Sequence, residues 1–230
     1  MGIRETAAKS GLALLVFMLG ILISGCMQTT EPASDANFTP RDRKLLAFPP
    51  YGQAKIAEPF LRHVVDYDRK DAPGTILIDT DARYLYYVLP EGKAIRYGVI
   101  VGKETLAWSG VAKIGRMSEW PTWTPTAEIK KRLAPQKVPD FVGPGPENPM
   151  GARAMYLYEG NKDTLYRIHG TNEPELIGQA KSSGCISLTN EDAIDLYNRV
   201  KIGTTVVVLK SMGDPRYNPR MALSGASNKN

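Results

Sequence analysis

Short runs of aromatic and β-branched residues, separated by turns rich in Gly, Pro and Asp, dominate the middle of the chain. The first three runs span residues 75–79, 84–89 and 94–101, and the intervening turns contain Asp81 and Pro90-Glu91-Gly92. This pattern is typical of an antiparallel meander. Further β-rich runs are residues 110–117, 154–158, 164–168 and 204–209. We therefore expect a mainly β domain.

Helical patterns are fewer. Residues 190–200 predict a helix with Asn190 as N-cap, acidic residues in its first turn, and Ile194 and Tyr197 on one face. A shorter helix is predicted at 127–133, inside the proline-rich stretch 119–151. A long irregular stretch in a compact domain is usually functional, so we expect it to form a lid or a wall of a substrate site. The fold class is thus mainly β with one or two short helices.

The N-terminus has the pattern of a targeting segment. Arg4 and Lys9 precede an apolar run at residues 11–23, which is too short to cross a bilayer on its own. The run ends in Ile23-Ser24-Gly25-Cys26, which is similar to a bacterial lipobox. We expect residues 1–26 to be a lipoprotein signal peptide and Cys26 to carry the lipid. The alternatives are an uncleaved anchor helix and an ordinary secretory signal.

Lipidation would place the protein in the periplasm, anchored to a membrane. Met27 follows Cys26, where an aspartate would signal retention in the inner membrane, so we expect the outer membrane. Residues 27–71 are interpreted as a tether and N-terminal extension, residues 72–212 as the catalytic domain and residues 213–230 as a flexible tail. His63, in the extension, is interpreted as a solvated or edge histidine.

Charge excludes one class of partner. The chain has 29 Lys and Arg against 24 Asp and Glu, for a formal net charge of +5. The sequence has no cluster of basic residues interleaved with aromatics, so we expect no nucleic-acid partner.

Cysteine and histidine carry the candidate chemistry. If Cys26 holds a lipid, Cys185 is an unpaired thiol in a compartment where disulfides normally form. His169 ends one predicted strand and is followed by Gly170, and Cys185 follows a loop of small residues. A thiol needs a nearby base to become a nucleophile, so we expect His169 to lie beside Cys185 and to lower its pKa. The alternative is a buried structural Cys and a strand-end His.

Small residues before Cys185 would also let backbone N–H groups approach a carbonyl oxygen and form an oxyanion hole. A zinc site is weakly supported, because one Cys and one His fall short of the three protein ligands of a catalytic zinc. Acyl transfer through a thiol needs no cofactor, and none is expected.

Several motifs carry a family resemblance. They are His169-Gly170-Thr171-Asn172-Glu173-Pro174, Ser182-Ser183-Gly184-Cys185-Ile186, Trp120-Pro121-Thr122-Trp123-Thr124-Pro125 and Asn148-Pro149-Met150-Gly151-Ala152-Arg153-Ala154. Together they resemble the L,D-transpeptidase catalytic domain of the YkuD (ErfK/YbiS/YcfS/YnhG) family. The resemblance implies a β-sandwich-like fold that acts on peptidoglycan stem peptides.

The resemblance also assigns roles. Cys185 would be the nucleophile and His169 the general base, the Gly170 carbonyl would orient the imidazole, and the amides of Gly184 and Cys185 would stabilise the oxyanion. Two positions depart from the family pattern: Ser183 stands where His is common, and Ser187 where Arg is common. Without that Arg, a substrate carboxylate would lose a guanidinium partner, and Arg153 or Lys181 could take its place. Ser183, Ser187, Arg153 and Asn172 are the expected substrate-binding residues.

The function expected is L,D-transpeptidation. In this reaction Cys185 attacks a carbonyl of a stem peptide and becomes acylated, and an amine then resolves the thioester. That amine would come from a second stem peptide, giving a 3→3 cross-link, or from an outer-membrane protein. A second hypothesis is resolution by water, giving an L,D-carboxypeptidase or hydrolase. A third, of another class, is a catalytically silent peptidoglycan-binding module.

Overall fold

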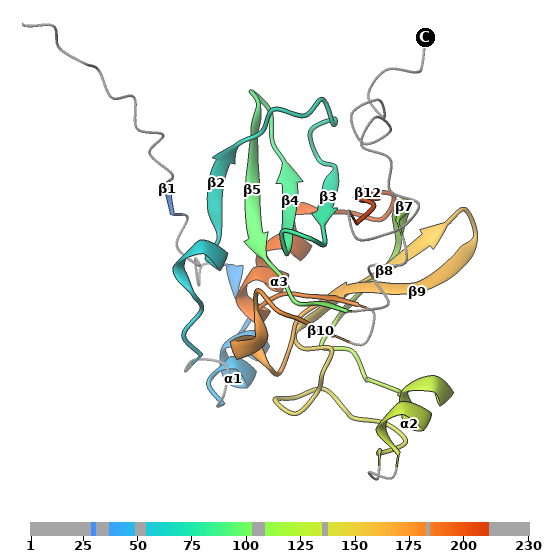
Figure 1. Cartoon of the computed structure of the whole chain (residues 1–230). Helices are drawn as coiled ribbons and strands as arrows, with labels where there is room; N and C mark the ends of the chain where they lie inside the picture. Colours follow the sequence, from blue (N-terminus) through green and yellow to red (C-terminus); the bar gives the residue numbers. More distant parts are fainter. Residues whose placement is uncertain are drawn as a thin grey trace, which may run out of the picture.

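The computed structural model describes residues 29–30, 37–48, 54–102, 109–134, 138–182 and 185–211 (Figure 1). The predicted signal peptide with Cys26, the predicted tail and the pair Ser183-Gly184 lie outside the described residues.

Strands dominate the described part of the chain, as predicted. They are β1 (Thr29–Thr30), β2 (His63–Asp66), β3 (Ile76–Asp79), β4 (Tyr84–Val88), β5 (Lys93–Gly98), β6 (Val101–Gly102), β7 (Gly110–Glu119), β8 (Arg153–Glu159), β9 (Lys162–His169), β10 (Ala180–Ser182), β11 (Ile186–Ser187) and β12 (Thr205–Val208). The helices in this part are α1 (Pro40–Leu46), α2 (Ala127–Leu133) and α3 (Asn190–Arg199), with 3₁₀ turns η2 (Glu58–Phe60) and η4 (Pro174–Leu176).

Among the described residues, ten strands form one mixed sheet in the order β1-β2-β5-β4-β3-β12-β7-β8-β9-β11. The meander β3-β4-β5 is antiparallel, as the sequence predicted. Two pairs are parallel: β12 lies beside β3, and β11 lies beside β9. The short strands β6 and β10 form a separate parallel pair.

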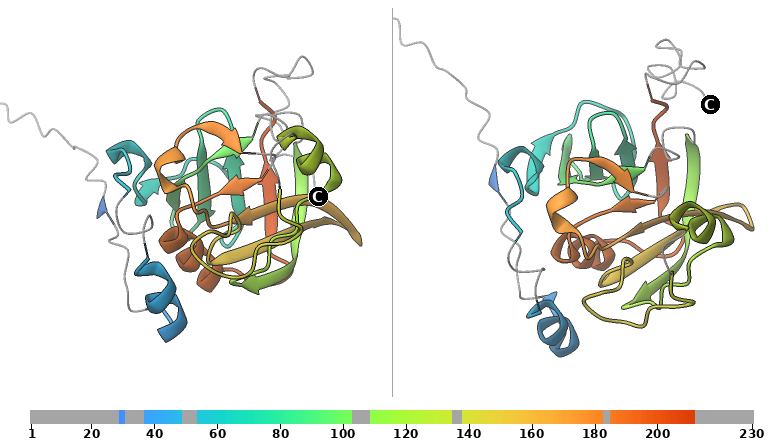
Figure 2. Two further views of the ribbon diagram at one scale, coloured as in Figure 1. Left: turned by 90° about the horizontal axis from the view of Figure 1, so that it is seen from below. Right: turned by 60° about the horizontal axis from the view of Figure 1, so that its bottom comes forward.

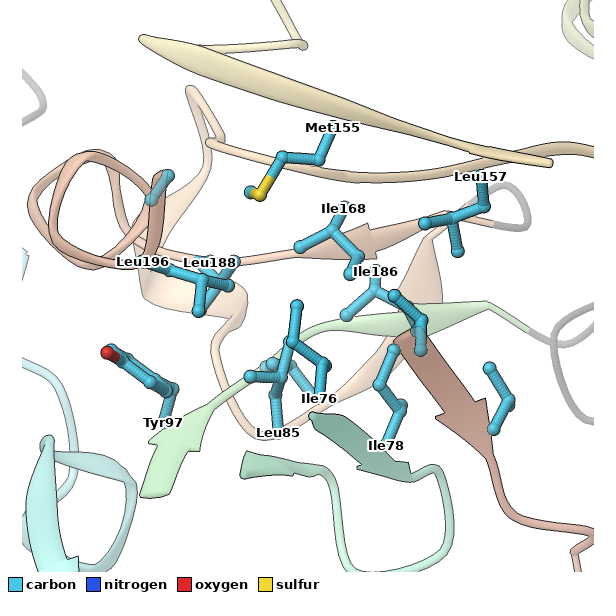
Figure 3. Packing of buried hydrophobic residues seen from close by; sticks show 14 of the residues in the cluster. Ile76, Ile78, Leu85, Tyr97, Met155, Leu157, Ile168, Ile186, Leu188 and Leu196 are labelled. Carbon is cyan, nitrogen blue, oxygen red and sulfur yellow. The ribbon is translucent and has the colours of Figure 1, made fainter. Parts of the chain in front are cut away.

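The large sheet folds over on itself and encloses the main core. Figure 3 shows side chains of β3, β4 and β5 (Ile76, Leu85 and Tyr97 among them) facing those of β8, β9 and β11 across one apolar layer, which includes Met155, Ile168 and Ile186. An antiparallel bridge between Ile100 and Ser187 ties the two halves together next to β11. Mainly β architecture with a sandwich-like core is therefore confirmed, and β9 and β11, at one end of the strand order, contribute Ile168 and Ile186 to that core.

Helix α3 packs against β8 and β9 (Figure 2). It begins with a capped turn. The N-cap is Thr189, whose hydroxyl accepts a hydrogen bond from the Asp192 N–H at 3.1 Å. The prediction that Asn190 is the N-cap was wrong, because the side chain of Asn190 turns inward toward other loops. Ile194 is buried and Tyr197 is half-buried on the inner face of the helix.

The segment interpreted as a tether contains a docked helix. Thr39 caps α1 in a capping box with Asp42, which places that carboxylate at the first turn. Asp42 is fully buried, and Phe38, Leu45 and Leu46 pack on Trp120 and Ile194 of the domain. Helix α1 therefore adds a third described helix, outside the domain for which one or two short helices were predicted. The sequence missed α1 because its seven residues are mostly polar.

The residues that follow, up to the meander, also differ from the expectation. His63 in β2 is buried rather than solvated, although β2 lies near the edge of the sheet, between the two-residue strand β1 and β5. Its Nε2 lies 3.8 Å from the Glu58 carboxylate.

The irregular stretch between β7 and β8 is organised by one buried amide. Asn148 donates hydrogen bonds to the carbonyls of Pro121, Val142 and Gly143 and accepts one from the Met150 N–H. Trp123 and Val142 form an antiparallel bridge in the same loop. The predicted helix α2 occupies its expected bounds, and the loop lies below the β8–β9 hairpin in Figure 1.

Candidate active site

The parallel pairing of β9 with β11 brings the predicted nucleophile and base to one face of the sheet. Ile186 lies opposite Ile168, and Ser187 opposite His169. Cys185 precedes Ile186 and so lies beside Arg167. Alternate side chains of a strand point to the same face, so Cys185 and Ser187 share a side with each other and with His169. The thiol and the imidazole thus lie on one face of neighbouring strands although sixteen positions separate them in the sequence.

His169 is held by contacts at both ring nitrogens. Its Nδ1 lies 2.5 Å from the Gly170 carbonyl oxygen, and its Nε2 lies 3.5 Å from the Ser187 hydroxyl. A carbonyl can only accept, so Nδ1 carries the ring proton and Nε2 is left as the basic nitrogen. The residue is buried, with 7% of its surface exposed. Burial, and to a smaller extent the charge of Arg167, lowers the pKa of His169 to about 4, although the Gly170 carbonyl opposes this shift.

Cys185 is a free thiol whose pKa is raised rather than lowered. Burial raises the pKa to about 11, and the charge and backbone N–H of Arg167 offset only part of this effect. The prediction that His169 holds the thiol pKa below its ordinary value was wrong, because the two ring nitrogens are directed at Gly170 and Ser187. At neutral pH the resting pair is therefore a neutral thiol beside a neutral imidazole.

Behind His169, Asn190 fixes the turn that follows β9. Its Oδ1 accepts the Ala152 N–H at 2.7 Å, and its Nδ2 donates to the Thr171 carbonyl at 2.8 Å. A Cβ added at Gly170 would collide with this same Oδ1. Only glycine therefore lets Asn190 approach closely enough to bond the Ala152 N–H and the Thr171 carbonyl on either side of this turn.

Arg153 does not face the thiol. Its guanidinium forms two hydrogen bonds with Asp42 of α1, at 2.9 and 2.8 Å, and the side chain is 1% exposed. The Trp120 indole N–H donates to the same carboxylate at 2.7 Å. The expected role of Arg153 in binding a substrate carboxylate is therefore replaced by an internal ion pair. Its backbone carbonyl accepts the Gly170 N–H at 3.0 Å, so the pair supports the turn behind His169.

The other expected substrate-binding residues lie in different places. Asn172 is half-buried and reaches the Glu147 carbonyl at 3.5 Å, joining the turn after His169 to the long loop. Ser187 is buried and contacts the imidazole instead of facing outward. Lys181 is exposed on β10. Ser183 and Gly184, including the expected oxyanion amide, lie outside the described residues.

Sequence reasoning missed two arginines on the strands that lead to the thiol. Arg116 of β7, Tyr156 of β8 and Arg167 of β9 are register partners across three strands. Both guanidinium groups lie over the Tyr156 ring, at 3.5 and 4.6 Å from its centroid. These residues are far apart in the sequence and irregularities interrupt both pairings, so no local pattern could have grouped them.

Among the described residues, no group of three or more His, Cys, Asp or Glu side chains is arranged to hold a metal ion. In that same part of the chain, no helix has the length and apolar character needed to cross a membrane.

Residues 73–208 match the L,D-transpeptidase catalytic domain (YkuD). The chain belongs to this family. The match spans the meander, the long loop, β9, β11 and α3, which are the elements that position Cys185 and His169. Two curated L,D-transpeptidases of Escherichia coli strain K12 are similar to the chain. The probable L,D-transpeptidase ErfK/SrfK is 36% identical over 58% of this chain, and the probable L,D-transpeptidase YbiS is 38% identical over 58%.

The chain spans 43% of the length of each of these two L,D-transpeptidases. A crystal structure from Brucella melitensis is 46% identical and covers 67% of this chain and 96% of its own, with a TM-score of 0.46. That protein is described as a probable carnitine operon oxidoreductase.

Proposed function

We propose that the chain is a peptidoglycan L,D-transpeptidase in which Cys185 is the nucleophile and His169 the general base. The observation that carries the proposal is the β9–β11 register, which sets the thiol and the basic Nε2 on one face of adjacent strands. Family membership supports the reaction class.

The acylation step follows from the neutral resting pair. Nε2 of His169 takes the thiol proton as Sγ of Cys185 attacks the carbonyl between the third and fourth stem residues. The tetrahedral oxyanion would be stabilised by the amides of Cys185 and Gly184. Collapse breaks the C–N bond, the imidazolium returns its proton to the leaving amine, and a thioester remains.

In the second step an amine attacks the thioester. His169 accepts a proton from that amine, the C–S bond breaks and the thiol is restored with its proton. The Gly170 carbonyl at Nδ1 stabilises the imidazolium that forms in each step, because it accepts the hydrogen bond from the charged ring. No electrons are gained or lost, so the cycle closes without a redox partner.

The experiment is to incubate the protein with purified muropeptides and to identify the products by mass spectrometry. We expect loss of the D-residue at position four together with a 3→3 cross-linked product, and neither with Cys185→Ser or His169→Ala. Release of the D-residue without cross-links would favour the carboxypeptidase. No covalent intermediate and no product from the folded protein would favour the silent binding module.

We also propose that Cys26 carries a lipid that anchors the protein in the periplasm, at the outer membrane. The proposal rests on the lipobox-like Ile23-Ser24-Gly25-Cys26 after an apolar run. Cys26→Ala should abolish incorporation of a labelled fatty acid. An outer-membrane protein as amine acceptor would show as a muropeptide covalently attached to that protein.

A further inference from the structure

A row of basic and aromatic side chains leads across the sheet to the thiol. Arg116, Tyr156 and Arg167 are neighbours in register on β7, β8 and β9, and Cys185 lies next to Arg167 on the following strand. Both guanidinium groups pack on the Tyr156 ring, at 3.5 Å from its centroid for Arg116 and 4.6 Å for Arg167. Such stacking holds both side chains in place at little entropic cost on binding.

The charges of the row do not cancel. Asp163 forms a two-point ion pair with Arg167, at 2.7 and 2.9 Å. Partial burial opposes ionisation, but the hydrogen bonds from Arg167 keep the pKa of Asp163 below its ordinary value, so the carboxylate is charged at neutral pH. Arg116 is exposed and, within the described part of the chain, its guanidinium forms no ion pair. One positive charge is left available to a ligand.

We propose that this row binds a free carboxylate of the stem peptide, with Arg116 as the direct contact and Arg167 as its support. The inference rests on the proposed function and names the group on the substrate that the site recognises. Arg116 supplies the guanidinium that is missing at Ser187. Arg153 cannot supply it, because Asp42 holds its side chain. A guanidinium fork suits a carboxylate because it can donate two parallel hydrogen bonds.

The distances fit a carboxylate close to the scissile bond. Neighbouring strands are about 4.8 Å apart, so Tyr156, beneath the Arg116 guanidinium, is roughly 10 Å from the strand of Cys185. A residue extends the peptide by about 3.5 Å, so a carboxylate one or two residues from the attacked carbonyl, or at the end of a diamino acid side chain, falls within this span.

The first test needs no peptide. Alkylation of Cys185 by anionic iodoacetate and by neutral iodoacetamide is followed by mass spectrometry of the Cys185 peptide from the full-length protein. Arg116→Gln should lower the iodoacetate-to-iodoacetamide rate ratio roughly two- to tenfold, and salt should reduce this effect. Asp163→Asn should raise the ratio, since it frees the charge of Arg167. Arg41→Gln, the same change on exposed α1, is the matched control and should leave the ratio unchanged. Equal ratios in all four proteins would refute a basic site at the thiol.

The second test compares a stem tetrapeptide carrying free carboxylates with its carboxamide analogues, measuring acylation of Cys185. Arg116→Gln should raise KM for the carboxylate peptide roughly 10- to 100-fold and leave the carboxamides unaffected. Equal effects on both peptides would overturn the carboxylate assignment. If no peptide acylates Cys185 while the alkylation ratios respond as expected, the proposed transpeptidase activity fails and the anion site stands.

Discussion

The buried ion pair between Asp42 and Arg153 gives a sharp test of how the N-terminal segment contributes to stability. Asp42→Asn keeps the shape of the side chain but removes the charge that faces a guanidinium 1% exposed to solvent. Breaking a buried pair from one side costs about 3–5 kcal/mol, because the remaining charge is left without its partner. For a chain of this size, that corresponds to a melting temperature lower by roughly 10 °C.

The pKa of Asp42 gives a second, smaller estimate of the contribution of this carboxylate. Burial opposes ionisation, but hydrogen bonds led by that from Arg153 lower the pKa from 3.8 to about 2. At about 1.4 kcal/mol per pKa unit, this difference corresponds to about 2.5 kcal/mol of stability. Because the folded-state pKa is the lower one, this stability is present above pH 4 and is lost as the pH falls toward 2. Asp42→Asn has no carboxylate to titrate at this position. Its free energy of unfolding should therefore fall less than that of the wild-type protein between pH 4 and pH 2.

The assay is denaturant unfolding of the full-length protein at pH 7, repeated at pH 3, with trypsin cleavage near Arg41 and Arg43 of α1 as a local probe. Asp140→Asn is the matched control, since its carboxylate pairs with Lys130 while 93% exposed, and an ion pair so open to water contributes little to stability. We expect Asp42→Asn to unfold at lower denaturant and α1 to be cleaved faster. If the two variants are equally stable and equally resistant to trypsin, α1 does not stabilise the domain through this pair.

Three further predictions concern the site. Asn190→Ala should destabilise the protein by about 2–3 kcal/mol, because it leaves the Ala152 N–H and the Thr171 carbonyl buried without partners, and should lower kcat; unchanged denaturation would exclude this role. The rate of iodoacetamide labelling of Cys185 should keep rising with pH toward about 11, and the rate of acylation by substrate should fall on the acid side near pH 4, where His169 gains a proton. A labelling midpoint below 8.5 would contradict the neutral pair. A carbapenem should open on Cys185 and add one drug mass, seen by intact-protein mass spectrometry, more slowly than in family members with the usual His and Arg; Cys185→Ser should show no adduct.

Local patterns predicted the meander and α3 because their stability depends on contacts close in the sequence. Alternation between residues 75 and 101 reflects strands with one buried face, and the acidic first turn of α3 reflects its dipole. The N-cap prediction failed by one residue because two candidate caps, Thr189 and Asn190, are adjacent, and only the tertiary contacts of Asn190 decide between them.

The candidate site was likewise predicted only where the information is local in the sequence. Cys185 and His169 were identified from the rarity of their residue types and from the motifs around them. Their resting pKa values could not be predicted, since burial and the position of Arg167 depend on the packing of four strands. Arg153 was misassigned because its partner Asp42 is more than a hundred positions away, in a segment without hydrophobic periodicity. The Arg116–Tyr156–Arg167 row depends on strand register, which single residues do not encode.

The spacing of thiol and imidazole is set by a backbone ladder, not by the length of chain that joins them. Ser187 and Ile186 are fixed against His169 and Ile168 by parallel pairing, while residues 171–182 leave the sheet and return. Insertions or exchanges within that excursion can therefore occur without shifting Ile186 and Ser187 against Ile168 and His169. A lineage or a protein engineer can alter this loop while the strand register that holds Cys185 and His169 on one face stays constant.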